Sequence, residues 1–391
     1  MFLDPLFKLM ADKQASDLFL TAGAPIQIKI NGTVMPVNSQ TLDPAAVKKI
    51  AYEVMTEDQI AHFEKTWELN FAVGRAALGS FRVNVFRQRG ATAVVVRYIK
   101  PEVPALEALG LPLLFRELIM EKLGMILVVG STGSGKSTTL ASMLDYRNAT
   151  RTGHILSIED PIEFVFRHKK SIVNQREIGM DTMSYETALT SAMREAPDLL
   201  MIGEIRDHKT LQASLLFAQT GHLCLSTLHA NNSYHALNRI LNFFPREARE
   251  GMLADLSLSL RCVISQRLIR TKDGGRVPAV EVLLNTPHIA ELIKNGNIGE
   301  IKEAMEQSMA QGSQTFEQAL FGLYSEGKIS IEEALRNSDS PTNLHWLINN
   351  AGKGPGQDQA PASSSTAKDP VSRNSQPPDD LSSIKLNFDS M

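Results

Sequence analysis

The sequence predicts an α/β protein with an α+β N-terminal domain, an alternating α/β domain and a helical end. Within residues 1–98 the strand-like and helix-like segments are grouped, which suits a sheet with helices on one face. From Met125 onward strands and helices alternate, which predicts a parallel sheet covered on both faces. A glycine-rich segment, residues 130–137, directly follows the first strand of that alternating part. The 391 residues suffice to bury such cores without metals or disulfides.

The N-terminal domain is predicted to span residues 1–98. Asn31-Gly32 is a strong signal for a hairpin turn, and Asp43-Pro44 is a typical start of a helix. The expected strands are Leu18–Thr21, Ile26–Ile30, Thr33–Val37, Trp67–Val73, Ser80–Gln88 and Ala91–Tyr98, and the expected helices are Asp43–Met55 and Glu57–Lys65. Residues 99–115 contain three prolines, so we expect an interdomain linker without regular structure there.

The alternating domain is predicted to span residues 116–286. Its expected strands are Met125–Val129, Ile155–Glu159, Leu199–Gly203, Leu223–Thr227 and Ala279–Leu284. One expected helix begins near Lys136. The other expected helices cover Ser184–Glu195, His208–Gln219, Tyr234–Asn242 and Arg246–Arg270. Residues 287–350 are predicted to be helical. Residues 351–391 hold 5 Pro, 3 Gly and 8 Ser and are predicted to be a disordered tail. Its end, Asp380–Phe388, is either a short docking motif or plain solvated chain.

Charge and cysteine content narrow the possible functions. The chain has 40 Lys and Arg against 43 Asp and Glu, a net charge of −3, so it lacks the basic excess of a protein that grips nucleic acid. Cys224 and Cys262 are too few for a disulfide scaffold or a four-cysteine zinc site, and their apolar surroundings predict reduced core residues. No stretch approaches the roughly 20 apolar residues of a membrane span. We therefore expect a cytoplasmic protein with no nucleic-acid partner and no direct membrane insertion.

The segment Gly130-Ser-Thr-Gly-Ser-Gly-Lys-Ser137 fits the phosphate-binding pattern G-x-x-x-x-G-K-[ST]. Glycines let backbone N–H groups turn around phosphate oxygens, and the following helix presents its positive end to the anion. Lys136 would reach the β- and γ-phosphates, and the Ser137 hydroxyl would bind Mg²⁺. The alternative, a surface turn, is disfavoured by the strand before the loop and the helix after it. The expected nucleotide-binding residues are Ser131, Thr132, Gly133, Ser134, Gly135, Lys136, Ser137 and Thr138.

Carboxylates follow two of the predicted strands. Glu159, Asp160 and Glu163 come after one strand, and Glu204 comes after another. Because ligands of doubly wound sheets bind beyond the carboxyl ends of the strands, these acids should line the crevice that holds the phosphates. Hydrolysis needs one carboxylate near Mg²⁺ and another that orients and deprotonates the attacking water. Each acid alone is as well explained as a solvated turn or a helix cap, but the set beside the loop favours catalysis.

Two histidines and two arginines are further candidates. His222 and His229 stand at the two ends of one predicted strand, from where both could reach a γ-phosphate, although strand-end histidines are commonly structural or solvated. Arg194 and Arg206 flank the second acidic segment. Either arginine could act on the substrate or simply pair with a neighbouring acid, as Arg206 could with Asp207.

Arg82 and Arg97 lie on adjacent predicted strands of the N-terminal domain. On the period-2 alternation of a strand, Arg82 shares a face with Asn84 and Phe86. One interpretation is a polar sheet face. The other is that Arg82 and Arg97 supply positive charge to a phosphate held by a neighbouring subunit, since arginines donated in trans are a common way to compensate a leaving γ-phosphate.

Four ordered segments together resemble the secretion ATPase superfamily, and within it the type IV pilus retraction ATPases PilT and PilU. The resemblance covers about residues 1–345, and Ala15–Gly23 and Gly79–Asn84 also resemble the N-terminal domain of these ATPases. The four segments are the phosphate-binding loop, Ile158-Glu-Asp-Pro-Ile-Glu-Phe164, Gly203-Glu-Ile-Arg-Asp207, and Thr220-Gly-His222 with Ser226-Thr-Leu-His-Ala230.

The resemblance implies a PAS-like N-terminal domain, a RecA-like P-loop ATPase domain and a homo-hexameric ring. It implies ATP and Mg²⁺, with ATP between the ATPase domain of one subunit and the N-terminal domain of its neighbour. Glu163 would be the general base and Glu204 the acid near Mg²⁺, partly through water, although which of the two is the base stays open. His222 and His229 would sense the γ-phosphate. Arg82 and Arg97 would be the arginines donated in trans.

Three departures from PilT make the chain more similar to PilU, an accessory retraction ATPase that acts with PilT. His288–Ile293 replaces a segment in which PilT has Arg and Asn, Phe19 replaces a His, and the tail extends the chain. We expect a hexameric ATPase that powers or assists pilus retraction and twitching motility with PilT. It would dock on a platform protein at the cytoplasmic face of the inner membrane. The alternative is an ATP-binding regulatory ring that modulates PilT with little motor activity of its own.

Overall fold

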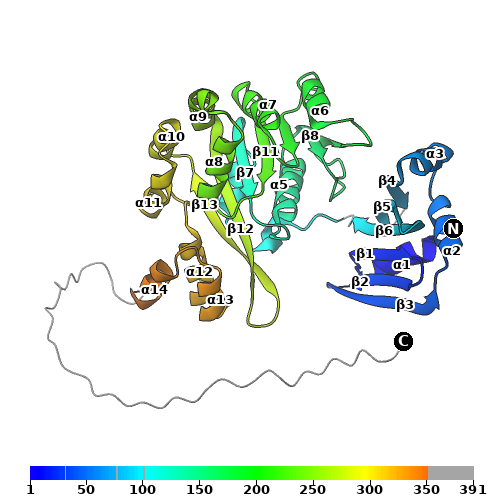
Figure 1. Ribbon diagram of the computed structural model, residues 1–391. Helices are drawn as coiled ribbons and strands as arrows, with labels where there is room; N and C mark the ends of the chain where they lie inside the picture. The colour runs from blue at the N-terminus through cyan, green and yellow to red at the C-terminus, as the bar shows by residue number, and fades with distance from the viewer. Residues whose placement is uncertain (31, 76–77, 100–101, 351–391) are drawn as a thin grey trace, which may run out of the picture. The chain divides into compact units, whose positions relative to one another are not determined.

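The computed structural model describes residues 1–30, 32–75, 78–99 and 102–350, and within them the chain forms two β-sheets (Figure 1). Six strands between residues 17 and 99 form the first sheet, and seven strands between residues 124 and 284 form the second. Each sheet has its own hydrophobic core. Met1–Ile348 form one compact unit, so the domain boundaries expected at residues 98, 115 and 286 stay predictions.

The first sheet is antiparallel, in the order β3-β2-β1-β6-β5-β4. Its strands are β1 (Asp17–Thr21), β2 (Pro25–Ile30), β3 (Thr33–Thr41), β4 (Glu68–Arg75), β5 (Gly79–Gln88) and β6 (Ala91–Ile99). Its helices are α1 (Asp4–Asp12), α2 (Pro44–Tyr52) and α3 (Glu57–Thr66). Apolar side chains of all three helices pack on one sheet face, where Leu18 lies opposite Ile28 and Val96. This confirms the expected sheet with helices on one face.

Helix α1 was not predicted from the sequence. It begins with a proline in its first turn, and its buried residues Leu6, Phe7 and Met10 follow helical spacing. Phe7 is fully buried, and its ring stacks on that of Phe81 with 4.3 Å between the centroids. The helix therefore contributes a large aromatic side chain to the centre of the N-terminal core.

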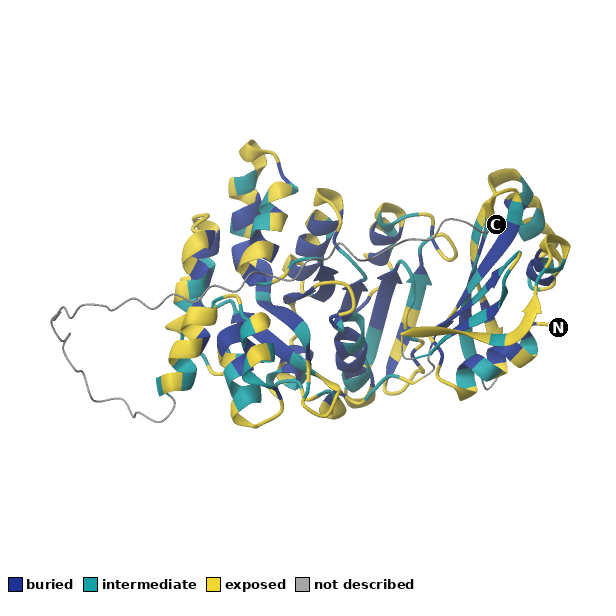
Figure 2. Cartoon of the chain, turned by 60° about the horizontal axis from the view of Figure 1, so that its bottom comes forward, coloured by how far each residue is buried: buried dark blue, intermediate teal, exposed yellow. Residues whose placement is uncertain are grey.

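The second sheet has the order β13-β12-β7-β11-β10-β8-β9, and all its pairs are parallel except β12 with β13. The central strands are buried on both faces (Figure 2), which explains their continuous apolar sequences. The strands are β7 (Gly124–Val129), β8 (Gly153–Glu159), β9 (Ser171–Glu177), β10 (Leu199–Ile202), β11 (Leu223–Leu228), β12 (Leu260–Arg270) and β13 (Arg276–Leu284).

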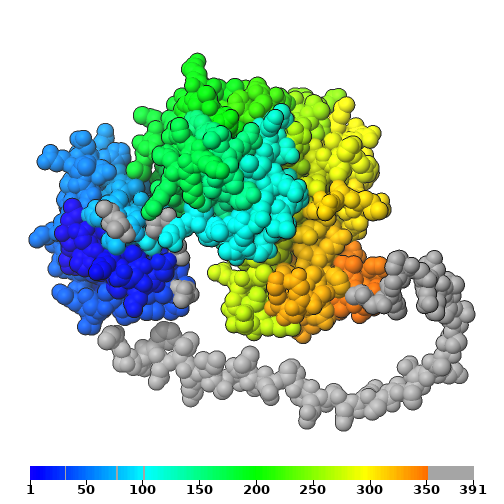
Figure 3. Space-filling view, turned by 180° about the vertical axis from the view of Figure 1, so that it is seen from behind, coloured from blue at the N-terminus to red at the C-terminus, as the bar shows by residue number. Residues whose placement is uncertain are grey.

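Helices cover both faces of the second sheet, as predicted. On one face α4 (Leu114–Leu118) and α5 (Lys136–Thr150) pack in a common core. On the other face lie α6 (Tyr185–Ala192), α7 (His208–Gln219), α8 (Ser233–Asn242), α9 (Arg249–Ser259), α10 (Pro287–Lys294) and α11 (Ile301–Glu306). The remaining helices, α12 (Phe316–Ser325), α13 (Ile331–Arg336) and α14 (Pro341–Asn350), share a smaller core with the far ends of β12 and β13 (Figure 3). The expected helical end is confirmed over its described residues.

Three local predictions were wrong. The helix expected at Arg246–Arg270 ends at Ser259, and the chain continues as strand β12, because its apolar run pairs with β7 in the sheet interior. The expected linker at 99–115 includes a 3₁₀ turn, Leu106–Leu109, and the first residues of α4. Strand β9 was missed because it lies at the sheet edge, where alternate residues are exposed.

Other expectations are met or lie outside the described part of the chain. Cys224 and Cys262 are buried and unpaired, which confirms them as core residues. No helix in the described ranges is long and apolar enough to cross a membrane. Asn31 of the expected hairpin turn and the tail 351–391, including Asp380–Phe388, lie outside the described residues.

Replacing Phe7 by alanine should destabilise the N-terminal sheet. Truncating a buried phenylalanine costs about 3–5 kcal/mol, through lost burial and the cavity left behind. Hydrogen–deuterium exchange of the amides in β5 and β6 measures this as a lower free energy of opening. Lys8→Ala is the matched control, because Lys8 is exposed on the same helix. Equal exchange in the two variants would contradict the assignment of α1 to this core.

Candidate functional site

The glycine-rich loop connects the central strand β7 to helix α5. Gly133 and Gly135 have φ angles of 79° and 93°, in the left-handed region that favours glycine. At Gly135 a Cβ atom would lie only 2.6 Å from the side-chain nitrogen of Gln266, so a larger residue would also displace this neighbour. Helix α5 begins at Lys136, as predicted. The loop thus has the backbone shape that lets N–H groups face an anion.

Lys136 forms hydrogen bonds with the backbone of the loop that it follows. Its ammonium group donates hydrogen bonds to the carbonyl oxygens of Gly130 and Ser131, each 2.9 Å long. Burial lowers the pKa of Lys136, while the carboxylates of Glu204 and Glu163 act in the opposite direction. Ser134 Oγ is buried and has no hydrogen-bond partner in the described part of the chain. A phosphate oxygen would satisfy such a group, so the loop residues fit a nucleotide phosphate.

Gln266, on the neighbouring strand β12, forms hydrogen bonds with the loop and with the helix that follows it. This residue was not predicted from the sequence. Its side-chain oxygen accepts a hydrogen bond from Thr139 Oγ1 at 2.7 Å, and its side-chain nitrogen donates to the carbonyl oxygen of Ser134 at 2.9 Å. Both bonds are buried. No local sequence pattern indicates this role, because the segment was expected to be helical and Gln266 lies about 130 residues from the loop.

The predicted acids meet at the carboxyl ends of the strands. Glu163 Oε1 accepts a hydrogen bond from Ser137 Oγ at 3.0 Å. Glu204 lies 2.8 Å from Arg206 Nε and 3.3 Å from His229 Nε2. Arg206 also contacts Asp160 at 2.9 Å, so it pairs with these two acids, whereas Asp207 caps helix α7.

Glu159 is the most deeply buried of these acids. Burial raises its pKa to about 7, although Ser157 and Gln175 donate hydrogen bonds to its Oε1. The segment that follows it is held by Glu177 at the end of β9, whose Oε2 accepts from the Ile162 backbone N–H at 3.0 Å. Glu177 was not predicted from the sequence, because the strand that carries it, β9, was not predicted.

Arg82 and Arg97 line the same cavity as the phosphate-binding loop of their own chain. They pair directly across β5 and β6. Arg97 Nε lies 2.9 Å from Asp17, and Arg82 NH2 lies 3.4 Å from Glu177. The cavity has a volume of about 730 Å³ and also contains Lys136, Glu163, Glu204 and His229. The two arginines thus line the cavity of the loop in the same chain, and their expected role toward a neighbouring subunit stays a prediction.

Of the predicted catalytic residues, His222 and Arg194 do not line this cavity. His222 precedes β11 and lies at its amino end, whereas His229 follows the carboxyl end, so the strand separates them by about 20 Å at 3.3 Å per residue. His222 packs against Phe217 instead. Arg194 is exposed after α6 and before the amino end of β10. The expectation that both histidines reach one γ-phosphate is therefore wrong for a single chain, because a parallel sheet sends the two ends of a strand to opposite edges.

Comparison with known proteins identifies the family. The family model described as type II/IV secretion system protein matches residues 1–336. The chain belongs to this family. It is 47% identical over 349 residues to the type IV pilus ATPase PilU of Pseudomonas aeruginosa, covering 89% of this chain and 91% of that protein. It is 40% identical over 344 residues to the pilus retraction ATPase PilT of the same organism, covering 88% of this chain and all of PilT.

A solved structure of this secretion family agrees with the fold. The crystal structure of the pilus retraction motor PilT with bound ADP superposes with a TM-score of 0.81 at 42% identity, covering 87% of this chain and 98% of that one. The resemblance to the pilus ATPases is thereby confirmed, and so is the fold of an α+β N-terminal domain followed by a RecA-like domain. The chain is an ATPase of this family.

The buried Glu159 should make stability depend on pH. Its pKa is about 7 in the folded chain against an ordinary value of 4.5, so the folded state binds this proton more tightly. The resulting stabilisation is present in full below pH 4.5 and is lost as the pH rises through 7. Glu159→Gln keeps a side-chain oxygen that can accept the hydrogen bonds from Ser157 and Gln175, but its amide cannot ionise.

This variant should melt at least about 3 °C above the wild type at pH 8, and at nearly the same temperature at pH 5. Thermal unfolding at the two pH values checks this. The exposed Glu68→Gln is the control and should show no such difference. A constant effect of Glu159→Gln at both pH values would contradict the raised pKa.

Proposed function

We propose that this chain hydrolyses ATP in the cavity lined by the phosphate-binding loop. The energy would power or assist retraction of a type IV pilus, together with a PilT-type ATPase. One observation carries the proposal. The loop lysine, the Ser137–Glu163 pair and the Glu204 cluster converge in one cavity of a chain similar to PilU and PilT. The crystal structure of PilT contains bound ADP, which supports nucleotide binding in the cavity of the phosphate-binding loop.

Each of these residues has its own role in the proposed hydrolysis. Lys136 and the loop N–H groups hold the β- and γ-phosphates and compensate their charge. The Ser137 hydroxyl and the Glu204 carboxylate are hard oxygen donors, so they fit Mg²⁺, with Glu204 acting partly through water. Mg²⁺, when bound, supplies additional positive charge to the transferring phosphoryl group. Arg82 and Arg97 add positive charge from the N-terminal domain.

The contacts favour Glu163 as the general base. The Glu204 carboxylate is already engaged by Arg206 Nε at 2.8 Å and by His229 Nε2 at 3.3 Å, so both of its oxygens have partners. Within the described residues, Glu163 accepts a hydrogen bond from the Ser137 hydroxyl through Oε1, so its other oxygen can receive a proton from water. His229 would respond to the γ-phosphate through Glu204. His222 and Arg194 could contribute only from another subunit of the proposed homo-hexamer.

The proposed assembly is a ring on the cytoplasmic face of the inner membrane, docked on a pilus platform protein. The segment that departs from PilT, His288–Ile293, lies in helix α10. Its apolar residues Ile289, Leu292 and Ile293 are buried, whereas Glu291 is exposed. The change therefore alters the surface of the helix and leaves its packing intact, which supports a contact different from that of PilT and hence a PilU-type accessory role.

Two matched glutamine variants should separate the roles of the acids. Glu163→Gln should lower kcat by about 10²–10⁴-fold, because it removes the base, while the affinity for ATP stays within a few-fold. Glu204→Gln should raise the Mg²⁺ concentration required for half-maximal activity. Lys136→Ala should abolish tight ATP binding. Steady-state ATPase assays and nucleotide binding measure these effects, with the exposed Lys122→Ala as control. Activity of Lys136→Ala equal to that of the wild type would refute hydrolysis at this site.

Retraction in cells distinguishes a motor from a regulatory ring. If the chain is a motor, a strain that carries Lys136→Ala should lose pilus retraction as fully as a deletion strain, both with and without the PilT gene. Labelled pili observed by microscopy give the retraction frequency. Intact retraction with Lys136→Ala, but not with the deletion, would instead show a regulatory ring with little power of its own.

A further inference from the structure

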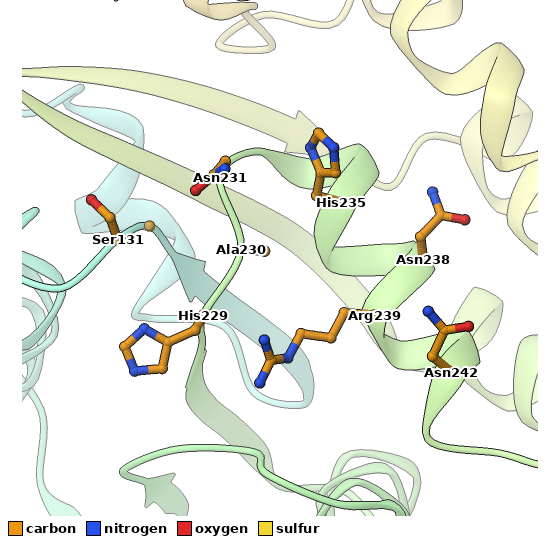
Figure 4. A pocket seen from close by; sticks show the side chains of 9 residues that line it. Ser131, His229, Ala230, Asn231, His235, Asn238, Arg239 and Asn242 are labelled. Carbon is orange, nitrogen blue, oxygen red and sulfur yellow. The ribbon is translucent and has the colours of Figure 1, made fainter.

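A second cavity adjoins the nucleotide cavity. It has a volume of about 400 Å³, and His229 lines both cavities. One side of it is formed by the start of the phosphate-binding loop, Gly130 and Ser131, and the other by helix α8 (Figure 4). His229 therefore stands at the border between the cavity of the phosphate-binding loop and this second cavity.

The chemistry of the cavity suits an anion. Its nine described lining residues include an arginine, two histidines and three asparagines but no carboxylate. Arg239 is exposed, and its guanidinium has no hydrogen bond or ion pair within the described residues. Figure 4 shows the Arg239 side chain reaching from α8 toward the segment of His229. A guanidinium without a partner, aimed into a cavity without acids, is a ready binding group for phosphate.

The helix that carries Arg239 is held firmly at its start. Asn232 Nδ2 donates to Asp339 at 2.8 Å, and Arg267 donates to the carbonyl oxygen of Asn231 at 3.1 Å. The Ser233 backbone N–H donates to the buried carboxylate of Glu281 at 2.7 Å. These contacts tie α8 to β12, β13 and the segment before α14, so the cavity wall is preorganised for its ligand.

We propose that this cavity is a subsite for inorganic phosphate released by hydrolysis, and that Arg239 is the residue that binds it. The inference rests on the proposed function. The oxygen of water bonds to the γ-phosphorus while Glu163 takes one proton of that water, the bond between the γ-phosphorus and the β-phosphate oxygen breaks, and the products are ADP and inorganic phosphate. Inorganic phosphate carries between one and two negative charges near pH 7, so a guanidinium attracts it. It moves from Lys136 past His229 to Arg239, which clears the γ position before ADP leaves.

The first test is product inhibition of the full-length protein by added inorganic phosphate. Loss of one charge-assisted contact should raise the phosphate inhibition constant of Arg239→Gln at least about tenfold. Its affinity for ADP should change less than about twofold, because Arg239 does not line the nucleotide cavity. Asn242→Ala, on the same cavity wall, should weaken inhibition in the same direction. Arg246→Gln is the matched control, since Arg246 is exposed and lies just beyond α8, outside the cavity lining.

The second test measures phosphate directly, so that failure of the inference differs from failure of the proposed function. Calorimetric titration of the ADP-loaded protein with phosphate should show binding that Arg239→Gln loses, even if no hydrolysis is detected. Equal phosphate affinity in wild type and Arg239→Gln would overturn the inference. An acidic side chain of a second copy is the other source of an anion. Unchanged phosphate binding with a smaller oligomer in Arg239→Gln would identify that source and overturn the inference as well.

Discussion

The shape of the phosphate-binding loop depends above all on buried hydrogen bonds that hold its backbone from two sides. Lys136 bonds the carbonyl oxygens of Gly130 and Ser131 from within, and Gln266 bonds that of Ser134 from β12. With these carbonyl groups engaged, the loop need not collapse onto itself when no phosphate is present. A preorganised loop loses little freedom on binding, so more of its interaction with phosphate appears as affinity.

The two hydrogen bonds of Gln266 to Thr139 and Ser134 require β12 to be a strand. Gln266 reaches the loop because β12 runs parallel to β7, with Ser265 opposite Val129 directly before the glycines. In a helix, successive residues would turn away from β7, and one side chain could not contact both Ser134 and Thr139. The next strand, β13, then places the buried Glu281 against Ser265 and the start of α8. The loop, the sheet edge and α8 are thus one connected polar network.

Much of the fold could be predicted from the sequence, because period-2 and apolar patterns report on local burial. The strands that end at Val129, Glu159 and Leu228 were located closely in this way. The acids were placed correctly because parallel strands bring their carboxyl ends to one edge. Gln266 and Glu177 were missed because their roles depend on strand neighbours that no local pattern specifies. His222 is a different case, because its distance from the site follows from the length and direction of β11 alone.

The position of Arg239 follows from the same network. The loop after His229 is fixed by Asn232 to Asp339 and by Asn231 to Arg267, and the Arg267 guanidinium stacks 3.9 Å above the Phe316 ring. A displacement of His229 along the cavity would therefore strain contacts that extend into the C-terminal helices. Packed contacts of this kind change in discrete steps more readily than by gradual deformation, so a shift of His229 would be felt at the end of β12 and in the helices beyond it. The polar residues of this edge thus serve the local chemistry and join the ATPase sheet to its helical end.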